Sequence, residues 1–357
     1  MTDTSQIDHP YYQALNRKRG PSRKLLFVPL GLFVVLLIVH AVYWFYAAGR
    51  IQERGEAWVA EQQAAGYEIS YHQLRVTGYP FRFTLRARDP EIVAPAADGG
   101  WRADMPRFAA SAQLFSFNHW ILTFGSPLNL ETEIDGTPAR YAIEAEQARV
   151  SLAGADGATD RIGAEIDALT IATTEGPRPA VSALGAVRLN GRIEDGDRLH
   201  ARIEANGAQL AAGLLSEDVS ATFGPEISRL RLDAELTEWN ELAAEGDLAA
   251  WTRAGGRILV NAAQMLWGPA EVAGEGDISL GEDFTPSGRL SVIVTDPDVL
   301  VGALVEAGLV APDQGEALQL AAMMAPRRGG GLALPFRLQN GGIFLGPARL
   351  GGLSDPD

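Results

Sequence analysis

Apolar and polar residues alternate with a period of two through much of the chain beyond residue 80. The first run is apolar at Phe81, Phe83, Leu85 and Ala87 and polar at Arg82, Thr84, Arg86 and Arg88. Similar runs occupy residues 141–145, 199–205 and 230–236. Successive side chains of a β-strand point to opposite faces of a sheet, so each run predicts a strand with one buried and one solvated face.

Asp-Gly and Asn-Gly pairs separate these runs. They lie at residues 135–136, 156–157, 195–196, 206–207 and 340–341. Both residues of such a pair tolerate the positive φ that two-residue hairpin turns require. The pattern predicts an antiparallel sheet that grows by hairpins, and it lacks the strand–helix–strand rhythm of a doubly wound fold.

Two departures from period two are visible. The apolar parity changes between Ile162–Ile166 and Leu169–Ile171, which predicts a β-bulge. Helical spacing of apolar residues is clearest in Thr237–Ala254 and Pro297–Ala325. The predicted fold class is therefore mainly β (α+β), with an elongated, curved antiparallel sheet, as a groove or as two lobes, and a few amphipathic helices.

An apolar segment near the N-terminus has the length of a membrane span. Leu25–Ala48 contains no Asp, Glu, Lys or Arg, and as a helix it would extend about 36 Å. A cleaved signal peptide would have a shorter apolar stretch and a small residue where Tyr46 stands. The segment is therefore predicted to be a retained signal anchor. Arg50–Ala65 is predicted to continue the helix as far as Gly66, a C-cap.

The flanks of this segment predict its orientation. The basic residues that precede it are Arg17, Lys18, Arg19, Arg23 and Lys24, and its far end carries Tyr43, Trp44 and Tyr46. Basic flanks stay in the cytoplasm, and aromatic rings favour the membrane interface. We expect a single-pass protein of the bacterial inner membrane, with a cytoplasmic N-terminus and its bulk in the periplasm.

The predicted organisation has five parts. They are a basic leader (1–24), the anchor (25–48), a juxtamembrane helix (49–66), a first β lobe (67–225) and a second β lobe with helices (226–357). The two lobes are inferred from an approximate echo of short motifs. Tyr79-Pro80-Phe81-Arg82-Phe83 near the start is echoed by Leu334-Pro335-Phe336-Arg337-Leu338 near the end.

Composition narrows the function classes. The 357 residues include 30 Lys and Arg against 45 Asp and Glu, for a net charge of −15, and no cysteine. An acidic chain is a poor partner for a polyanion, which argues against nucleic-acid binding. The lack of cysteine excludes disulfides, Cys-ligated zinc and Cys nucleophiles.

Motifs for catalysis and cofactor binding are absent from the sequence. It contains no GxSxG, HExxH, P-loop, EF-hand or dinucleotide motif. Among the histidines, His119 is expected in an aromatic core cluster and His200 on a solvated strand face. We therefore predict no catalytic residue, no metal site and no cofactor.

Three groups of short motifs resemble a known family. They are Gly78-Tyr79-Pro80-Phe81-Arg82-Phe83, Trp267-Gly268-Pro269 with Gly274-Glu275-Gly276, and Leu334-Pro335-Phe336-Arg337-Leu338-Gln339-Asn340-Gly341-Gly342-Ile343-Phe344-Leu345-Gly346-Pro347. With the anchor, they resemble the uncharacterised bacterial family called domain of unknown function 2125, from Leu25 to Leu350. More loosely, the chain is similar to AsmA-like envelope proteins. That resemblance implies curved sheets with apolar grooves implicated in lipid movement, although this chain is much shorter than the long lipid-bridging members.

Two sets of residues are candidate binding residues. Phe81, Phe83, Leu334 and Phe336, in the two echoing motifs, are predicted to line an apolar groove. Arg82, Arg86 and Arg88 share one strand face close to the predicted membrane surface. Either they contact phospholipid head groups, or they form a solvated face paired with neighbouring acids.

Three functions remain open at this stage. The first is a non-catalytic, membrane-anchored periplasmic protein that binds or transfers a lipid or hydrophobic envelope component in an apolar β-groove. The second is an assembly scaffold that recruits a protein partner through sheet edges. The third is a hydrolase with acidic residues in a cleft. An apolar sheet face left uncovered by helices would favour the first function, and a fully closed core would favour the second.

Overall fold

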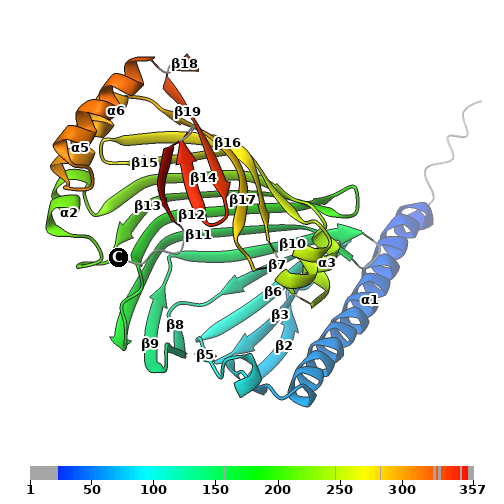
Figure 1. The fold of residues 1–357 in the computed structure, drawn as a ribbon. Coiled ribbons are helices and arrows are strands. Elements are labelled where there is room, and N and C mark those ends of the chain that lie inside the picture. The colour runs from blue at the N-terminus through cyan, green and yellow to red at the C-terminus, as the bar shows by residue number, and fades with distance from the viewer. Residues whose placement is uncertain are drawn as a thin grey trace, which may run out of the picture.

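A computed structural model of the chain describes most of the sequence (Figure 1). The described residues are 23–155, 158–245, 247–281, 283–324, 327–328, 331–345 and 348–352. The basic leader up to residue 22 and the predicted turn Asp156-Gly157 lie outside them.

The N-terminal helix α1, Arg23–Ala64, is continuous for 42 residues. It therefore joins the predicted anchor to the predicted juxtamembrane helix, and the chain leaves it through Gly66 at a positive φ of 99°. From Pro29 onward the helix is long and apolar enough to cross a membrane. Figure 1 shows α1 along one side of the molecule, where it contacts β1, β2 and β3 at the near end of a large curved sheet.

The sheet is antiparallel, as the period-two runs predict, and it is open, which the sequence pattern leaves undecided. Its shorter, earlier strands are β1 (Glu68–Ser70), β2 (Gln73–Thr77), β3 (Arg82–Arg88), β4 (Glu91–Val93), β5 (Arg102–Asp104), β6 (Arg107–Gln113), β7 (Ser116–Phe124), β8 (Leu128–Ile134) and β9 (Thr137–Glu144). Longer strands follow, namely β10 (Gln147–Ala155), β11 (Ala158–Glu175), β12 (Val181–Glu194), β13 (Arg198–Leu210), β14 (Glu226–Leu236), β15 (Arg257–Trp267), β16 (Ala270–Leu280) and β17 (Pro286–Val294). The last strands are β18 (Arg327–Arg328), β19 (Gly331–Gln339), β20 (Gly342–Leu345) and β21 (Ala348–Gly352).

Strand β11 is the branch point of the sheet. Its first part, as far as Asp167, pairs with β10, and its last part, from Thr170, pairs with β9. One branch continues from β10 through β7, β6 and β3 to β2, and the other from β9 through β8, β5 and β4 to β1. Beyond β11 the strands pair in chain order from β12 to β17 and then through β19, β20 and β21. The predicted lobe boundary at 225/226 falls where β13 and β14 pair in this one sheet, and the division into two lobes stays a prediction.

Three of the predicted turns join hairpins. Asp135-Gly136, Asp195-Gly196 and Asn340-Gly341 all have positive φ at both residues. They connect β8 to β9, β12 to β13 and β19 to β20. The predicted turn at Asn206-Gly207 is wrong, because both residues lie inside β13.

Asn206-Gly207 instead belongs to a crease across four strands. Ala168 in β11 has a φ of +50°, and Gly207 in β13 has a φ of +62°. Gly185 of β12 lies between them, because the residues on either side of it pair with the residues next to Ala168 and Gly207. A Cβ on Gly185 would come within 3.2 Å of the Asn206 carbonyl oxygen. At this line the apolar parity of each strand changes. The β-bulge predicted in β11 is nevertheless wrong, because β11 and β12 pair through this line without a shift of register.

Helices occupy both ends of the sheet. The two predicted helical segments each form two helices, α3 (Trp239–Glu245) with α4 (Leu248–Arg253), and α5 (Pro297–Glu306) with α6 (Pro312–Met324). A further helix, α2 (Glu217–Phe223), and one turn of 3₁₀ helix, η1 (Ala96–Asp98), were not predicted. A local signal for α2 exists, because Ser216 caps it by accepting a hydrogen bond from the Val219 amide, and two acids follow.

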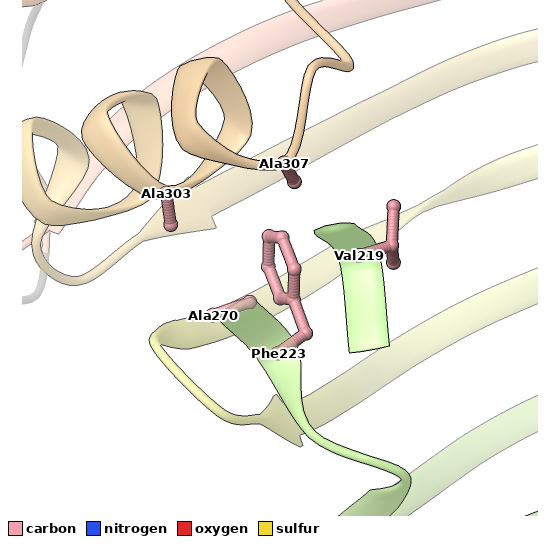
Figure 2. Close-up of a cluster of buried hydrophobic side chains, with 5 residues drawn as sticks. All are labelled: Val219, Phe223, Ala270, Ala303 and Ala307. Atoms are coloured by element: carbon pink, nitrogen blue, oxygen red, sulfur yellow. The ribbon is translucent and has the colours of Figure 1, made fainter. Parts of the chain in front are cut away.

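Two clusters of buried side chains close the ends of the sheet. At the end remote from α1, Phe223 of α2 packs against Ala303 of α5 and against Ala307, which caps that helix, with Val219 and Ala270 beside it (Figure 2). At the other end, Trp44 and Ala48 of α1 pack on Phe83 and Leu114.

Candidate functional site

One face of the sheet is apolar across twelve strands from β3 to β19. Cross-strand partners define a row through Phe83, Ala112, Trp120, Leu152, Ile162, Gly191, Ala201, Ala234, Val260, Gly276, Leu290 and Phe336. A parallel row runs through Leu85, Ala110, Leu122, Val150, Ala164, Leu189, Ile203, Leu232, Ala263, Gly274, Val292 and Leu334. At about 4.8 Å per strand, the rows span roughly 50 Å. We call this surface the apolar face.

Three of the four predicted groove residues belong to the apolar face. Phe83 and Phe336 lie at opposite ends of one row, and Leu334 ends the other. Phe81 is not on this face, because it precedes β3 in a turn and is 74% exposed. The structure thus places the two echoing motifs at opposite edges of one surface rather than around one pocket, and whether they contact a ligand stays a prediction.

No described helix covers the middle of the apolar face. Ile162 in β11 is 41% exposed, and Ile203 of β13 and Leu232 of β14, in the parallel row, are half-buried. A groove of about 410 Å³ lies over strands β13 to β17. Its lining is mainly aliphatic and includes Ile203, Leu230, Leu232, Val260, Met265 and Val292. The lining and the open shape of this groove would suit an apolar molecule.

The end of the apolar face at β3 meets α1. The rings of Trp44 and Phe83 stack with their centroids 5.3 Å apart and their planes at 10°. Trp44 Nε1 also donates a hydrogen bond to the Arg82 carbonyl oxygen at 3.2 Å. Phe83 is completely buried in this cluster, where Leu114 and Phe117 also pack, so the helix is docked on the sheet through a packed interface.

A cleft of about 540 Å³ lies between α1 and the sheet, just beyond the docking contact. It is lined by Tyr43, Tyr46, Arg50 and Arg54 of the helix and by Leu85, Phe117 and Trp120 of the sheet, among others. Because Leu85 and Trp120 also belong to the two rows, the cleft leads onto the apolar face at the point where the anchor ends.

The opposite face of the sheet is charged and ion-paired. Arg188 contacts Asp167 at 2.7 Å, and the Arg202 guanidinium contacts Asp233 at 2.6 Å. His200 Nε2 donates to Asp233 Oδ1 at 2.7 Å. The hydrogen bond from His200, followed by that from Arg202, lowers the pKa of Asp233 to about 2. His200 therefore lies on the polar face, as predicted, although it is partly buried.

The prediction for His119 is wrong. The residue is exposed, and it lies on the charged face because the register places it opposite Ala153, next to Ser151. His119 helps to line a polar cavity of about 800 Å³, together with Arg161, Asn190 and Arg192. Among the described residues, no group of three His, Asp or Glu side chains could hold a metal ion.

The three predicted arginines share the charged face with two more. Register places Arg75 of β2 opposite Arg86, and Arg107 of β6 opposite Arg88. Within the part of the chain that the structure describes, Arg75, Arg82, Arg86, Arg88 and Arg107 form no ion pair. The predicted arginines are therefore solvated but not paired with neighbouring acids in the described part of the chain, and contact with lipid head groups stays a prediction. Arg75 and Arg107 were missed because only strand register brings them to the cluster.

Comparison with known proteins agrees with the resemblance seen in the sequence. No curated protein and no solved structure matches the chain. Residues 44–354 match the family model described as "Uncharacterized protein conserved in bacteria (DUF2125)". The match begins at Trp44, the residue that docks α1 on the sheet, and spans every strand described above. The chain belongs to this DUF2125 family.

Proposed function

We propose that the protein is a non-catalytic, single-pass protein of the bacterial inner membrane that binds or transfers an acyl-chain lipid on its apolar face. The observation that carries the proposal is the bare middle of that face. Contiguous apolar side chains are left uncovered there, in a face that runs across twelve strands, and such exposed patches mark binding sites in soluble domains. Covering it would stabilise the complex by about 25 cal/mol for each Å² removed from water.

The position of the face supports a lipid as the occupant. The cleft beside Tyr43 and Tyr46 joins the face to the segment of α1 that leaves the membrane. An acyl chain that moves from the bilayer to this surface stays in apolar surroundings. The favourable free energy of binding therefore comes from removing the protein's own apolar side chains from water. The aliphatic lining offers few hydrogen-bonding groups, which suits an alkyl chain and does not suit a polar substrate.

A matched pair of substitutions tests the proposal. Ile162 on the apolar face and Ile121 on the charged face are 41% and 38% exposed. A carboxylate at either position is reached by water, so both variants should fold. The full-length chain is purified gently, and the lipids that it retains are extracted, identified and quantified by mass spectrometry. We expect Ile162→Asp to lose most of the lipid and Ile121→Asp to retain it.

Two results would count against lipid binding. Wild-type protein that carries no lipid, or equal lipid in the two variants, would favour the scaffold function. In that case the sheet edges, rather than the apolar face, would be searched for a protein partner.

Orientation is tested separately. Because basic residues precede the span, we expect a periplasm-active reporter fused after Leu350 to be active. A reporter that works only in the cytoplasm should be silent at the same position. The reverse pattern would place the apolar face on the cytoplasmic side.

A further inference from the structure

Two turns at the α1 end of the sheet carry aromatic side chains with no cover. Phe81 is 74% exposed and Phe115 is 90% exposed, and Tyr79 and Phe117 are partly exposed beside them. The Leu114 amide donates a hydrogen bond to the Phe81 carbonyl oxygen at 3.1 Å, which ties the two turns together. We call Phe81 and Phe115, with their turns, the aromatic tip.

The aromatic tip lies beside the apolar part of α1. His40 Nε2 is 3.0 Å from the Pro80 carbonyl oxygen, and the Tyr79 ring stacks on Phe45 with centroids 5.8 Å apart. His40 and Phe45 both fall within Leu25–Ala48, the segment without charged side chains. The turn is therefore fixed against the membrane-spanning helix and not against its exposed continuation.

Helix geometry gives the depth of the contact. A hydrocarbon core of about 30 Å needs about 20 helical residues, so a core that begins at Leu25 ends near Phe45. At about 1.5 Å per residue, His40 lies roughly 7 Å inside that boundary. Pro80, held at the level of His40, is at the same depth, and the Phe81 side chain follows it directly.

We infer that the aromatic tip is inserted in the membrane leaflet next to the folded domain. It forms a second contact between the protein and the bilayer, in addition to α1. Phe81 and Phe115, exposed when only protein surrounds them, are covered by lipid. The inference rests on α1 spanning the membrane, which the proposed function also requires. It adds that the cleft between α1 and the sheet, which leads to the apolar face, opens directly on the leaflet.

Spin labelling tests this placement, because the chain contains no cysteine and single cysteines can be introduced cleanly. The full-length protein with Phe115→Cys or Phe81→Cys is labelled with a nitroxide in vesicles of phosphatidylethanolamine and phosphatidylglycerol. The control is Leu309→Cys, which is 57% exposed and lies beyond α5 at the opposite end of the sheet. Accessibility is measured to oxygen, which partitions into lipid, and to a water-soluble nickel complex.

We expect the labels at 81 and 115 to be several-fold more accessible to oxygen than to nickel, and the label at 309 to show the reverse. Nickel accessibility at 81 and 115 equal to that at 309 would overturn the inference. The readout does not depend on bound lipid, so a protein that carries none on its apolar face still reports the depth of the tip. The melting temperature of each labelled variant, expected within a few degrees of wild type, shows that the comparison is between folded proteins.

Discussion

The covered ends and the bare middle of the apolar face have the same alternating sequence but different surroundings. Near α1, Phe83 is sealed by Trp44, and at the remote end of the sheet Ala270 of β16 is buried under Phe223 of α2 and the residues of α5. Between them Ile162 has the same strand phase as Phe83 and no described helix over it. Alternation therefore determines which face is apolar, while the placement of a few helices determines where that face becomes a core and where it remains a surface.

The largest effect is expected where the face is sealed. Phe83→Asp would leave a carboxylate buried against Trp44, and we expect it to destabilise the protein by about 4 kcal/mol. The measurement is urea unfolding in detergent, followed by tryptophan fluorescence. Phe336→Asp, in the same row but only half-buried, should cost much less and should instead reduce bound lipid. Equal stability of the two variants would show that α1 is not docked as described.

A bulky substitution distinguishes core from surface with less disruption. Ala303 is buried against Phe223, so Ala303→Trp should lower stability by about 2 kcal/mol through overpacking. Ala263 lies in the bare middle, where no described layer opposes it, and Ala263→Trp should change stability by less than about 1 kcal/mol. The measurement is the shift in melting temperature. A large cost at Ala263 would indicate that something covers the middle.

Acid should act on the charged face and leave the apolar face unchanged. In the folded protein the pKa of Asp233 is about 2, below its usual value near 3.8. The stability that its ionised form contributes is present above about pH 4 and is lost as pH falls towards 2. Asp233→Asn should flatten the loss of stability over that interval in acid titrations followed by circular dichroism. Asp135→Asn, in an exposed turn that accommodates Asn, is the control and should keep the wild-type profile.

The smallest effect is expected in the arginine cluster. Arg75 and Arg86 are like charges on directly paired residues, so Arg86→Glu replaces repulsion with attraction. We expect a gain of about 0.5 kcal/mol at low salt, measured by chemical denaturation and diminished at high salt. A loss of stability would contradict this expectation and would mean that Arg86 makes a favourable interaction with another group of the folded protein. The neutral variant Arg86→Gln should give roughly half of the gain.

The strands and the anchor could be predicted from the sequence, because alternation and hydropathy are local properties. The echo of two motifs placed Phe83 and Phe336 in one predicted groove, but the extent of the apolar face could not be predicted, because it depends on register between strands far apart in the chain. Nothing near Phe83 shows that it shares a row with Phe336, nor that Arg107 lies opposite Arg88. The turn signal at Asn206-Gly207 misled for a related reason, since positive φ serves a crease as well as a hairpin.

The crease gives four strands a shared phase. Between Ile166 and Leu169 of β11 the apolar residues are three positions apart instead of two, and the facing segments of β12, β13 and β14 have the same extra step. The extra step in the apolar pattern ends where β14 meets β15, because the pairing of these two strands shifts between Ile227 and Arg229. The alternation of side chains between the two faces is therefore set jointly in the four strands. Deletion of a single residue here would move the apolar side chains of one strand to the opposite face from those of its neighbours. A second deletion in one neighbouring strand would not restore the common apolar face unless all the facing strands were shortened together.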